Sequence, residues 1–337
     1  MPRVSIIMPA YNAAEFLAAS VSSVISQTFK DWELLIVNDG STDATAEIAG
    51  EFADSDSRIR VIYQENAGVS SARNKGISLS VGDFIAFLDA DDAFCPDFLA
   101  DMLAAVDEND ADCAACGHLR AYPDGKTEPE PFPLPEGVSF EEDIMDGLVM
   151  PLLSDRLSSG LFNGFVWRYL FDRKKIIENN ITFSGAYLED ELFLIEYFSL
   201  PAVLAVAGKN LYLYTQNPKS ATRRYMPDCV DTFLFALARK RELVSRFDIP
   251  VPSWWELNTA WAGLLIAIGN IYAPGNNASF REKVKQSKSL MEIKEFSRAV
   301  SGYKPAGMGK NKTIVAKLYT MRLYSLLGLL YLLKNGK

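Results

Sequence analysis

The stretch "WELLIVNDGSTDATAEIAGEFA", residues 32–53, decides the fold class of this chain. Its first eight residues form a nearly continuous apolar run, which is typical of a strand buried on both faces of a sheet. Ser41 and Asp43 are good N-cap residues, and the residues after them have the spacing of a helix. The stretch therefore predicts one buried strand followed by one helix.

The same pattern of strand and helix continues on both sides of this stretch. Short apolar runs at 4–8, 59–64 and 84–89 predict three more strands, and residues 15–26 and 69–80 have helical spacing. This alternation predicts an α/β fold with a mixed, mainly parallel sheet and helices on both faces. Ligands bind at the carboxyl ends of such strands. The segments "PAYN", "NDGSTD", "ENAG" and "DADD", which each follow a strand, should therefore lie together.

The alternation weakens after the fourth strand. Five prolines between residues 122 and 138 predict an extended loop, and Ser139 and Glu142 have the spacing of a capping box before a helix. Residues 166–180 read as a turn and a helix, and residues 187–199 read as a helix with acids in its first turn.

The rest of the chain reads as two strands and then a series of helices. "PAVLAVAG" and "LYLYTQN" predict two returning strands, and helical spacing covers residues 230–247, 254–272, 280–299 and 313–333. We therefore expect an α/β domain over residues 1–216, a helical subdomain over 217–305 and a basic amphipathic segment over 306–337.

The charge of the chain is acidic overall but uneven along its length. The formal net charge is −9, which argues against nucleic-acid binding. No aspartate or glutamate follows Glu295, whereas the tail carries Arg298, Lys304, Lys310, Lys312, Lys317, Arg322, Lys334 and Lys337. An acidic body with a basic tail predicts that the tail meets something anionic.

The cysteines argue against a disulfide framework and against a zinc site. Cys113 and Cys116 form a C-x-x-C, but there is no second pair and the only histidine is His118. They read better as small apolar residues of a buried strand, in a reducing compartment. Pro9 ends the first apolar run and no apolar stretch reaches ~20 residues, so we expect neither a signal peptide nor a conventional membrane span.

Two acidic clusters are candidates for chemistry. Asp89 and Asp91 lie two residues apart where the fourth strand ends, and paired carboxylates suit a hard divalent cation that bridges phosphates. The alternative is that Asp92 caps the next helix and Asp91 is only solvated. The acids at 189–191 suit a helix N-terminus, and one of them could also act as a general base on a hydroxyl.

Three further residues lie beside these clusters in the predicted sheet. Asp39 ends the second strand and could accept a hydrogen bond from a base or ribose, or simply form the turn. Tyr11 could stack on a base or be a core or rim tyrosine. Arg73 could meet a phosphate or lie on a solvated helix face.

Five segments together resemble the motifs of family 2 glycosyltransferases, which have the GT-A fold: "VSIIMPAYN", "LLIVNDGSTDAT", "ENAGVSSARNKG", "FIAFLDADD" and "YLEDELF". The resemblance extends to around residue 215. It is to the type that builds bacterial cell-envelope polysaccharides and exopolysaccharides. It implies a nucleotide diphosphate sugar, usually a UDP-sugar, a Mg²⁺ or Mn²⁺ ion, and inverting transfer to a hydroxyl of a saccharide acceptor.

The resemblance also implies roles for individual residues. Asp91, together with Asp89, would bind the metal ion, and Asp190 would be the catalytic base. The nucleotide-sugar site would contain Pro9, Tyr11, Glu15, Asp39, Arg73, Asp89 and Ala90.

The resemblance also concerns two segments that would lie on the acceptor side and near the diphosphate. "VWRYLFDR" resembles an element that precedes the catalytic acids, which places Trp167 and Glu189 on the acceptor side together with the helical subdomain. "KSATRRYM" departs from the pattern of many relatives, and its Arg223 and Arg224 could close over the diphosphate.

The tail predicts a basic, leucine-rich helix that lies in a membrane surface. One polar or small stripe at helical spacing contains Lys310, Thr313, Lys317, Thr320, Tyr324, Gly328 and Tyr331. The alternative is a helix packed on the preceding helices. We therefore expect a cytoplasmic protein, peripheral on the inner face of the cell membrane, with a lipid-linked acceptor.

Two other functions stay open at this point. An enzyme of the same fold could load a sugar onto polyprenyl phosphate, although such relatives often carry membrane spans after the catalytic domain. A non-catalytic scaffold that binds a nucleotide sugar or a membrane is the alternative from another class, but both acidic motifs are intact here.

Overall fold

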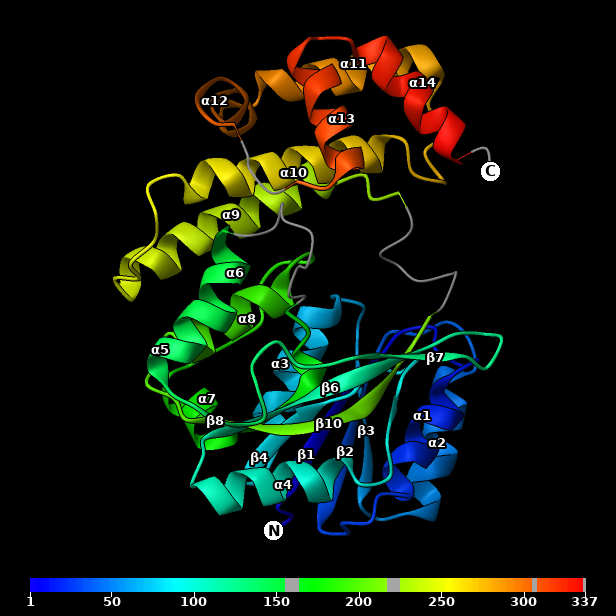
Figure 1. The fold of residues 1–337 in the computed structure, drawn as a ribbon. Helices are drawn as coiled ribbons and strands as arrows, with labels where there is room; N and C mark the ends of the chain where they lie inside the picture. Colours follow the sequence, from blue (N-terminus) through cyan, green and yellow to red (C-terminus); the bar gives the residue numbers. More distant parts are fainter. Residues whose placement is uncertain (155–163, 217–224, 305–307, 336–337) are drawn as a thin grey trace. The chain divides into compact units, whose positions relative to one another are not determined.

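The structure is a computed structural model, and it describes residues 1–154, 164–216, 225–304 and 308–335 (Figure 1). The chain divides into two compact units. The α/β unit consists of Met1–Val149 and Gly164–Asn217, and the helical unit consists of Met150–Asn163 and Pro218–Lys337. The roles assigned above to the three predicted parts of the chain stay predictions.

The first half of the α/β unit has the predicted alternation of strands and helices. Three helices separate its four parallel strands, in the order β3-β2-β1-β4. The strands are β1 (Val4–Ala10), β2 (Trp32–Asp39), β3 (Ile59–Gln64) and β4 (Phe84–Phe87). The helices are α1 (Leu17–Ile25), α2 (Thr45–Ser55) and α3 (Val69–Leu79). This half is wholly parallel and carries the candidate site, and the antiparallel strands of the second half make the sheet mixed, as predicted.

The second half of the sheet is mixed and continues the order as β4-β9-β6-β10-β5. β6 and β10 are parallel, β9 is antiparallel to both β4 and β6, and β5 is antiparallel to β10. Two further strands pair at its edges, β7 with β6 and β8 with β10. The strands are β5 (Ala93–Phe94), β6 (Cys113–Ala121), β7 (Thr127–Glu130), β8 (Gly137–Ser139), β9 (Tyr169–Asp172) and β10 (Leu204–Thr215).

Three predictions about this half are wrong in detail. The proline-rich stretch contains β7 and β8, and residues 166–180 contain β9 between a short turn and a helix. β9 is only four residues long, too short to show a period in the sequence. The two returning strands are one strand, β10, because Gly208 at φ +61° lets it bulge between Val206 and Asn210 without ending.

The helices of the α/β unit complete this architecture. They include a π-helical turn (Met145–Val149) and a 3₁₀ turn (Val166–Arg168), and the helices α4 (Phe98–Asn109), α5 (Glu141–Ile144), α7 (Arg173–Glu178) and α8 (Glu189–Phe198). The predicted capping box is absent, because Ser139 lies in β8 and no side chain caps α5. Of the two predicted caps of α2, Ser41 lies too far before Thr45, where that helix begins, whereas Asp43 Oδ1 accepts from the Thr45 N–H at 3.0 Å.

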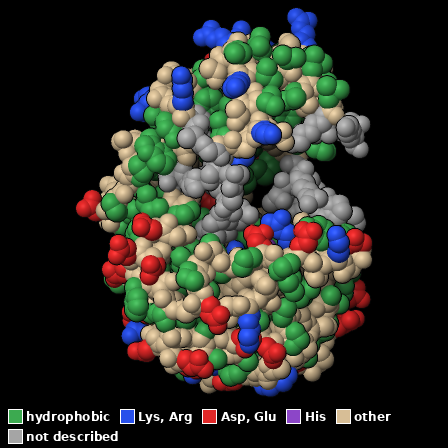
Figure 2. Space-filling model, in the orientation of Figure 1, with side chains coloured by type: hydrophobic (Ala, Val, Ile, Leu, Met, Phe, Trp, Pro, Cys, Tyr) green, Lys and Arg blue, Asp and Glu red, His purple; other side chains and the backbone are tan. Residues whose placement is uncertain are grey.

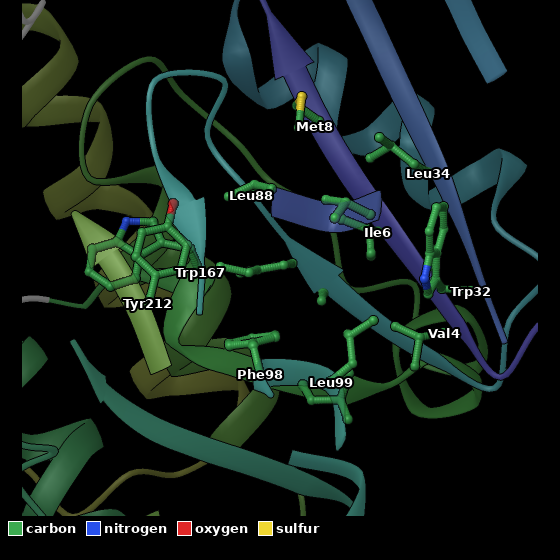
Figure 3. Close-up of a cluster of buried hydrophobic side chains, with 14 of the residues drawn as sticks. Val4, Ile6, Met8, Trp32, Leu34, Leu88, Phe98, Leu99, Trp167 and Tyr212 are labelled. Carbon is green, nitrogen blue, oxygen red and sulfur yellow. The ribbon is translucent and has the colours of Figure 1, made fainter. Parts of the chain in front are cut away.

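The core of the α/β unit lies between the sheet and the helices on each face. Val4, Ile6 and Met8 alternate along β1 and point to one face, where Figure 3 shows them in a cluster with Phe98 and Leu99 of α4. Ile7 of β1 points to the other face. There α3 packs so closely that a Cβ added to Gly76 would lie 2.3 Å from the Ile7 side chain. Helices therefore cover both faces, as predicted.

The helical unit is built around α10, which packs against α6, α9 and α12. Its helices are α6 (Met150–Ser154), α9 (Cys229–Arg246), α10 (Trp255–Ile271), α11 (Phe280–Ser289), α12 (Lys294–Gly302), α13 (Lys310–Thr320) and α14 (Tyr324–Asn335). The predicted helix 280–299 is broken by a 3₁₀ turn (Leu290–Glu292), and the predicted helix 313–333 is broken at Arg322, which has φ 58°. Among the described residues, no helix combines the length and apolar character that crossing a bilayer requires.

Candidate active site

The candidate active site lies at the carboxyl ends of the parallel strands. Asp39 is the last residue of β2, and Asp89 follows β4. Arg73 comes from α3, and Glu189 and Asp190 are the first residues of α8. All five side chains belong to the α/β unit, and four of them meet in one cluster.

Arg73 is the centre of that cluster. Its side chain is 4% exposed, and its Nη1 donates to Asp190 Oδ1 at 2.5 Å and to Glu189 Oε1 at 3.2 Å. Its Nη2 donates to Asp89 Oδ1 at 3.0 Å. A guanidinium is suited to this task because its planar fork can serve several carboxylates at fixed angles. The "DADD" and "LEDE" segments, far apart in sequence, therefore share one cation.

The charges in this cluster shift the acid–base behaviour of its members. Burial raises the pKa of Asp190 to about 7, Arg73 lowers it in part, and Glu189 and Asp89 raise it further. For Arg73, burial alone would lower the pKa, but the charges of the three carboxylates raise it above its usual value. Arg73 therefore stays charged, and Asp190 is a stronger base than an ordinary aspartate.

Contacts from α3 hold the segment that leads into α8. Asn74 and Phe183 exchange two hydrogen bonds, Asn74 Nδ2 to the Phe183 carbonyl at 2.9 Å and Phe183 N–H to Asn74 Oδ1 at 2.8 Å. Ser70 Oγ donates to the Gly185 carbonyl at 2.6 Å. These residues could not be found from the sequence, because a side chain that bonds a distant backbone leaves no pattern there.

Asp92 does not cap the helix that follows, contrary to the alternative weighed from the sequence. It is buried, and it accepts hydrogen bonds from the Tyr212 hydroxyl at 2.7 Å and from Thr215 N–H at 2.7 Å. The same hydroxyl accepts from the Asp89 backbone N–H at 3.3 Å. Asp92 and Tyr212 therefore fix the loop that presents Asp89 and Asp91, and α4 begins only at Phe98.

Asp91 is the acid of this loop that the structure leaves most open to a ligand. Burial, and then the negative charge of Asp89, raises the pKa of its carboxyl to about 6. The Asp91 backbone N–H stabilises the charged carboxylate and lowers this pKa in part. A half-buried carboxylate with little compensation and an acid beside it suits a cation.

These carboxylates fit a metal ion that the protein holds only in part. Across the described ranges, no group of three or more histidine, cysteine or acidic side chains is arranged to hold a metal. Asp91 and Asp89 would therefore supply a minority of the ligands. That fits Mg²⁺ or Mn²⁺, which keeps water and phosphate oxygens as its other ligands, and does not fit a closed zinc cage.

Asp39 organises the neighbouring loop. Its Oδ1 accepts from Gln64 Nε2 at 2.7 Å and from Ala67 N–H at 2.9 Å, and its Oδ2 accepts from Gly68 N–H at 2.9 Å. The carboxylate is buried, and Oδ2 keeps a lone pair for a further donor.

The other residues predicted for the nucleotide-sugar site lie at the ends of β1 and β4. Tyr11 is 52% exposed, and Glu15 is also exposed. Pro9 is half-buried in β1, and Ala90 is buried between Asp89 and Asp91. Ser41 Oγ and Asp43 Oδ2 accept from the backbone N–H groups of Asn12 and Ala14 and so tie the segments after β1 and β2 together.

Trp167 is a core residue. It is 2% exposed and stacks between Tyr212, with centroids 4.1 Å apart, and Phe165, with centroids 4.7 Å apart. Figure 3 shows Trp167 beside Tyr212. Its contribution to the site is indirect, because the preceding Val166 N–H donates to Asp190 Oδ2 at 3.3 Å. Arg223 and Arg224 lie outside the described residues.

The comparisons with known proteins agree with the sequence motifs. Residues 5–161 match the family model described as "Glycosyl transferase family 2", a match that ends before Asp190. The chain is similar to "Uncharacterized glycosyltransferase EpsJ" of Bacillus subtilis (strain 168), 34% identical over 227 residues that cover 66% of this chain and 63% of the relative. It is also similar to "Putative teichuronic acid biosynthesis glycosyltransferase TuaG" of the same strain, 33% identical over 162 residues that cover 47% of this chain and 64% of the relative. The matched stretches span less than two thirds of these relatives.

Two solved structures resemble this chain over its whole length. One is S. aureus TarS 1-349 in complex with UDP-GlcNAc, with a TM-score of 0.63 and 18% identity, covering 100% of this chain and 93% of that chain. The other is the mannosyltransferase PcManGT from Pyrobaculum calidifontis in complex with GDP-Man and Mn²⁺, with a TM-score of 0.53 and 15% identity, covering 100% and 88%. At this identity the likeness concerns the fold. Because the motifs, the family match and the fold agree, the chain belongs to the family 2 glycosyltransferases and has the GT-A fold.

Proposed function

We propose that this protein is an inverting glycosyltransferase that moves a sugar from a nucleotide diphosphate sugar, most simply a UDP-sugar, to a hydroxyl of a saccharide acceptor. The observation that carries the proposal is the contact of Arg73 with both Asp89 and Asp190. One guanidinium thus binds Asp89, the acid expected at the donor, through one nitrogen and Asp190, the acid expected at the acceptor, through the other. The ligands of the two similar structures, UDP-GlcNAc and GDP-Man with Mn²⁺, support a donor of this class.

Asp190 is the proposed general base. It would accept the proton of the acceptor hydroxyl as the oxygen attacks the anomeric carbon from the side opposite the diphosphate. Arg73 and the Val166 N–H each hold one of its oxygens, so the carboxylate has a fixed orientation. A single base in a single displacement leads to inversion at the anomeric carbon.

The donor would lie across the ends of β1, β2 and β4. The exposed ring of Tyr11 is available to stack on the base, and Asp39 Oδ2 can accept from the base or ribose. Asp89 and Asp91 would hold Mg²⁺ or Mn²⁺ against the diphosphate. When bound, the ion offsets the charge of the diphosphate as it leaves.

The metal requirement gives a direct test of this proposal. Release of UDP from a UDP-sugar should need Mg²⁺ or Mn²⁺ and stop in EDTA. Asp91→Asn should raise the metal concentration for half-maximal activity by at least about tenfold, because a neutral amide is a poorer ligand for a hard cation. Asp54→Asn, an exposed residue of α2, is the matched control and should behave as wild type. Equal turnover in EDTA across a panel of nucleotide sugars would refute the metal-dependent reaction.

The raised pKa of Asp190 gives a second prediction, on pH. A base works only when it is deprotonated, so kcat/KM should rise with pH and reach half of its plateau near the pKa of about 7, not near the ordinary aspartate value of 3.8. Asp91, whose pKa is about 6, would add to the loss below that pH, because protonation removes a metal ligand. Rates measured at saturating metal separate the two groups. A plateau that extends down to pH 5 would contradict the role of Asp190.

The acceptor and the location are finer parts of the proposal. We propose a lipid-linked saccharide of a cell-envelope polysaccharide as the acceptor, reached at the inner face of the cell membrane. The similarity to the protein named for teichuronic acid biosynthesis and the basic C-terminal segment support this assignment.

A further inference from the structure

The last helix of the chain is apolar on two opposite faces. On its inner face, Tyr331 stacks on Tyr272 with ring centroids 5.0 Å apart, and Leu327 is fully buried. Gly328 lies against α11 so closely that a Cβ there would come within 2.7 Å of the Phe280 ring. Tyr324, Gly328 and Tyr331, predicted as part of a polar stripe, therefore line the packed side of α14.

The outer face of α14 carries four leucines. Their exposed fractions are 51% for Leu326, 49% for Leu329, 49% for Leu332 and 75% for Leu333. A water-facing helix normally carries polar residues on the side away from its core, and a helix that is apolar all round is normally buried or in lipid. Within the described residues, packing of this unit accounts for one apolar face of α14 and leaves the leucines of the other face exposed.

The preceding residues extend this apolar surface. Ile314, Met321 and Leu323 are 46%, 66% and 43% exposed. Of the seventeen large apolar side chains that are exposed in the described part of the chain, seven lie between residues 314 and 333. Single exposed apolar residues are ordinary on protein surfaces, but a concentration of this kind marks an interaction site.

The same region carries a strong positive charge. Residues 280–337 contain thirteen lysines and arginines against three glutamates, a net charge of +10 in a chain whose overall charge is −9. Lys310 and Lys317 flank the exposed Ile314 on one side of α13, at the spacing of one helix face. Figure 2 shows green and blue side chains side by side over the helical unit.

We infer that α13 and α14 form a docking face for an anionic lipid bilayer, with the leucines inserted among the acyl chains and the lysines and arginines at the headgroups. The charge decides the occupant. Anionic headgroups complement the cations, while the apolar side chains leave water. A second copy of this chain, docked through the same face, would bring two strongly positive regions together and meet repulsion. The inference rests on the helical unit alone and does not depend on the reaction proposed above.

Co-sedimentation with vesicles tests this face. The whole protein should bind vesicles of mixed phosphatidylcholine and phosphatidylglycerol, and bind vesicles of phosphatidylcholine alone much more weakly. Leu326→Ser/Leu329→Ser/Leu333→Ser should lower the partition coefficient by about tenfold or more, because it removes the inserted surface. Lys310→Gln/Lys317→Gln should weaken binding by at least about fivefold and reduce its sensitivity to salt.

Matched control variants distinguish the loss of this face from a general loss of surface hydrophobicity or of folding. Val81→Ser/Ile177→Ser/Phe235→Ser changes three apolar residues elsewhere that are exposed by 42%, 42% and 44%, and should bind vesicles like the wild type. Lys126→Gln/Lys174→Gln changes two exposed lysines of the α/β unit and is the control for the Lys310→Gln/Lys317→Gln variant. Release of UDP from a soluble donor should be unchanged in the leucine variant, so that vesicle binding and the proposed reaction can fail separately.

Three outcomes would overturn the inference. The first is a wild-type protein that does not sediment with anionic vesicles at low salt. The second is a leucine variant that binds vesicles as well as the control variant. The third is a wild-type dimer in sedimentation velocity that the leucine variant dissociates without any change in vesicle binding, because the leucines would then cover a second copy of the chain.

Discussion

Replacing Asp190 by asparagine is expected to lower the rate of sugar transfer by about 10²–10⁴-fold, the usual contribution of a general base. The amide keeps the shape and can still accept a hydrogen bond from Arg73, but it cannot take up the acceptor proton. The KM for the donor should change little, because Asp190 is not among the residues proposed to hold the nucleotide. Transfer to a saccharide acceptor, measured by product formation at pH 8, is the assay.

The control for this variant is another aspartate in the first turn of a helix. Asp143 occupies that position in α5 and is exposed, so Asp143→Asn should transfer sugar at the wild-type rate. If Asp190→Asn retained most of the wild-type kcat with the correct donor, another group would have to accept the proton. Glu189, which shares Arg73, would be the first candidate.

Replacing Arg73 by leucine is expected to have the largest effect on stability. The side chain is buried, and its removal leaves Asp89, Glu189 and Asp190 facing each other without a cation. Loss of one partner from a buried ion pair costs about 3–5 kcal/mol. The free energy of unfolding, measured with urea at pH 8, should fall by about that amount, and sugar transfer should fall to background.

The pH dependence of this loss identifies its cause. Arg73 lowers the pKa of Asp190, so without Arg73 that pKa rises, and protonation of Asp190 relieves the repulsion among the carboxylates as the pH falls. The difference between variant and wild type should therefore be smaller at pH 5 than at pH 8. Arg60→Leu removes a half-exposed arginine from the buried Glu33, which keeps its hydrogen bonds from Ser5 Oγ and Val81 N–H, and should cost less than about 1 kcal/mol at either pH. An Arg73→Leu protein as stable as wild type at pH 8 would mean that the three carboxylates do not share this cation in solution.

Arg73→Lys separates charge from geometry. Lysine keeps the positive charge but is a single point donor, so it cannot reach three carboxylates in the way a guanidinium does. Stability should recover in large part, whereas the rate of transfer should stay well below wild type because Asp190 loses its fixed orientation. Full recovery of both properties would show that charge alone matters at this position.

Much of the fold could be read from the sequence, because its signals are local. Buried parallel strands are continuous apolar runs, and the helices between them have their own period, so β1 to β4 and α1 to α3 were predicted close to their bounds. The errors fall where local signals are short or ambiguous. β9 has four residues, and one glycine in β10 looks like the end of a strand when it is a bulge.

The motif acids could also be located from the sequence, but their partners could not. Asp89, Asp91 and Asp190 were picked out by type and position, and the comparisons support the family that those motifs indicated. The role of Asp92 was misread, because the hydroxyl it binds belongs to Tyr212, far along the chain. Trp167 was placed at the acceptor, whereas the structure buries it in an aromatic stack beside the site.

The sequence by itself determined the strand and helix order of the α/β unit, the family, the acids of the candidate site and the basic tail, since each depends on residue type and short-range spacing. The tertiary structure alone decided that Arg73 holds Asp89, Glu189 and Asp190 together and that burial brings the pKa of Asp190 to about 7. It also decided which side of α14 is packed and which leucines face outward. Contacts between residues remote in sequence, and the loss of water around them, arise only when the chain folds. They determine the pKa of Asp190 and which side of α14 is left exposed.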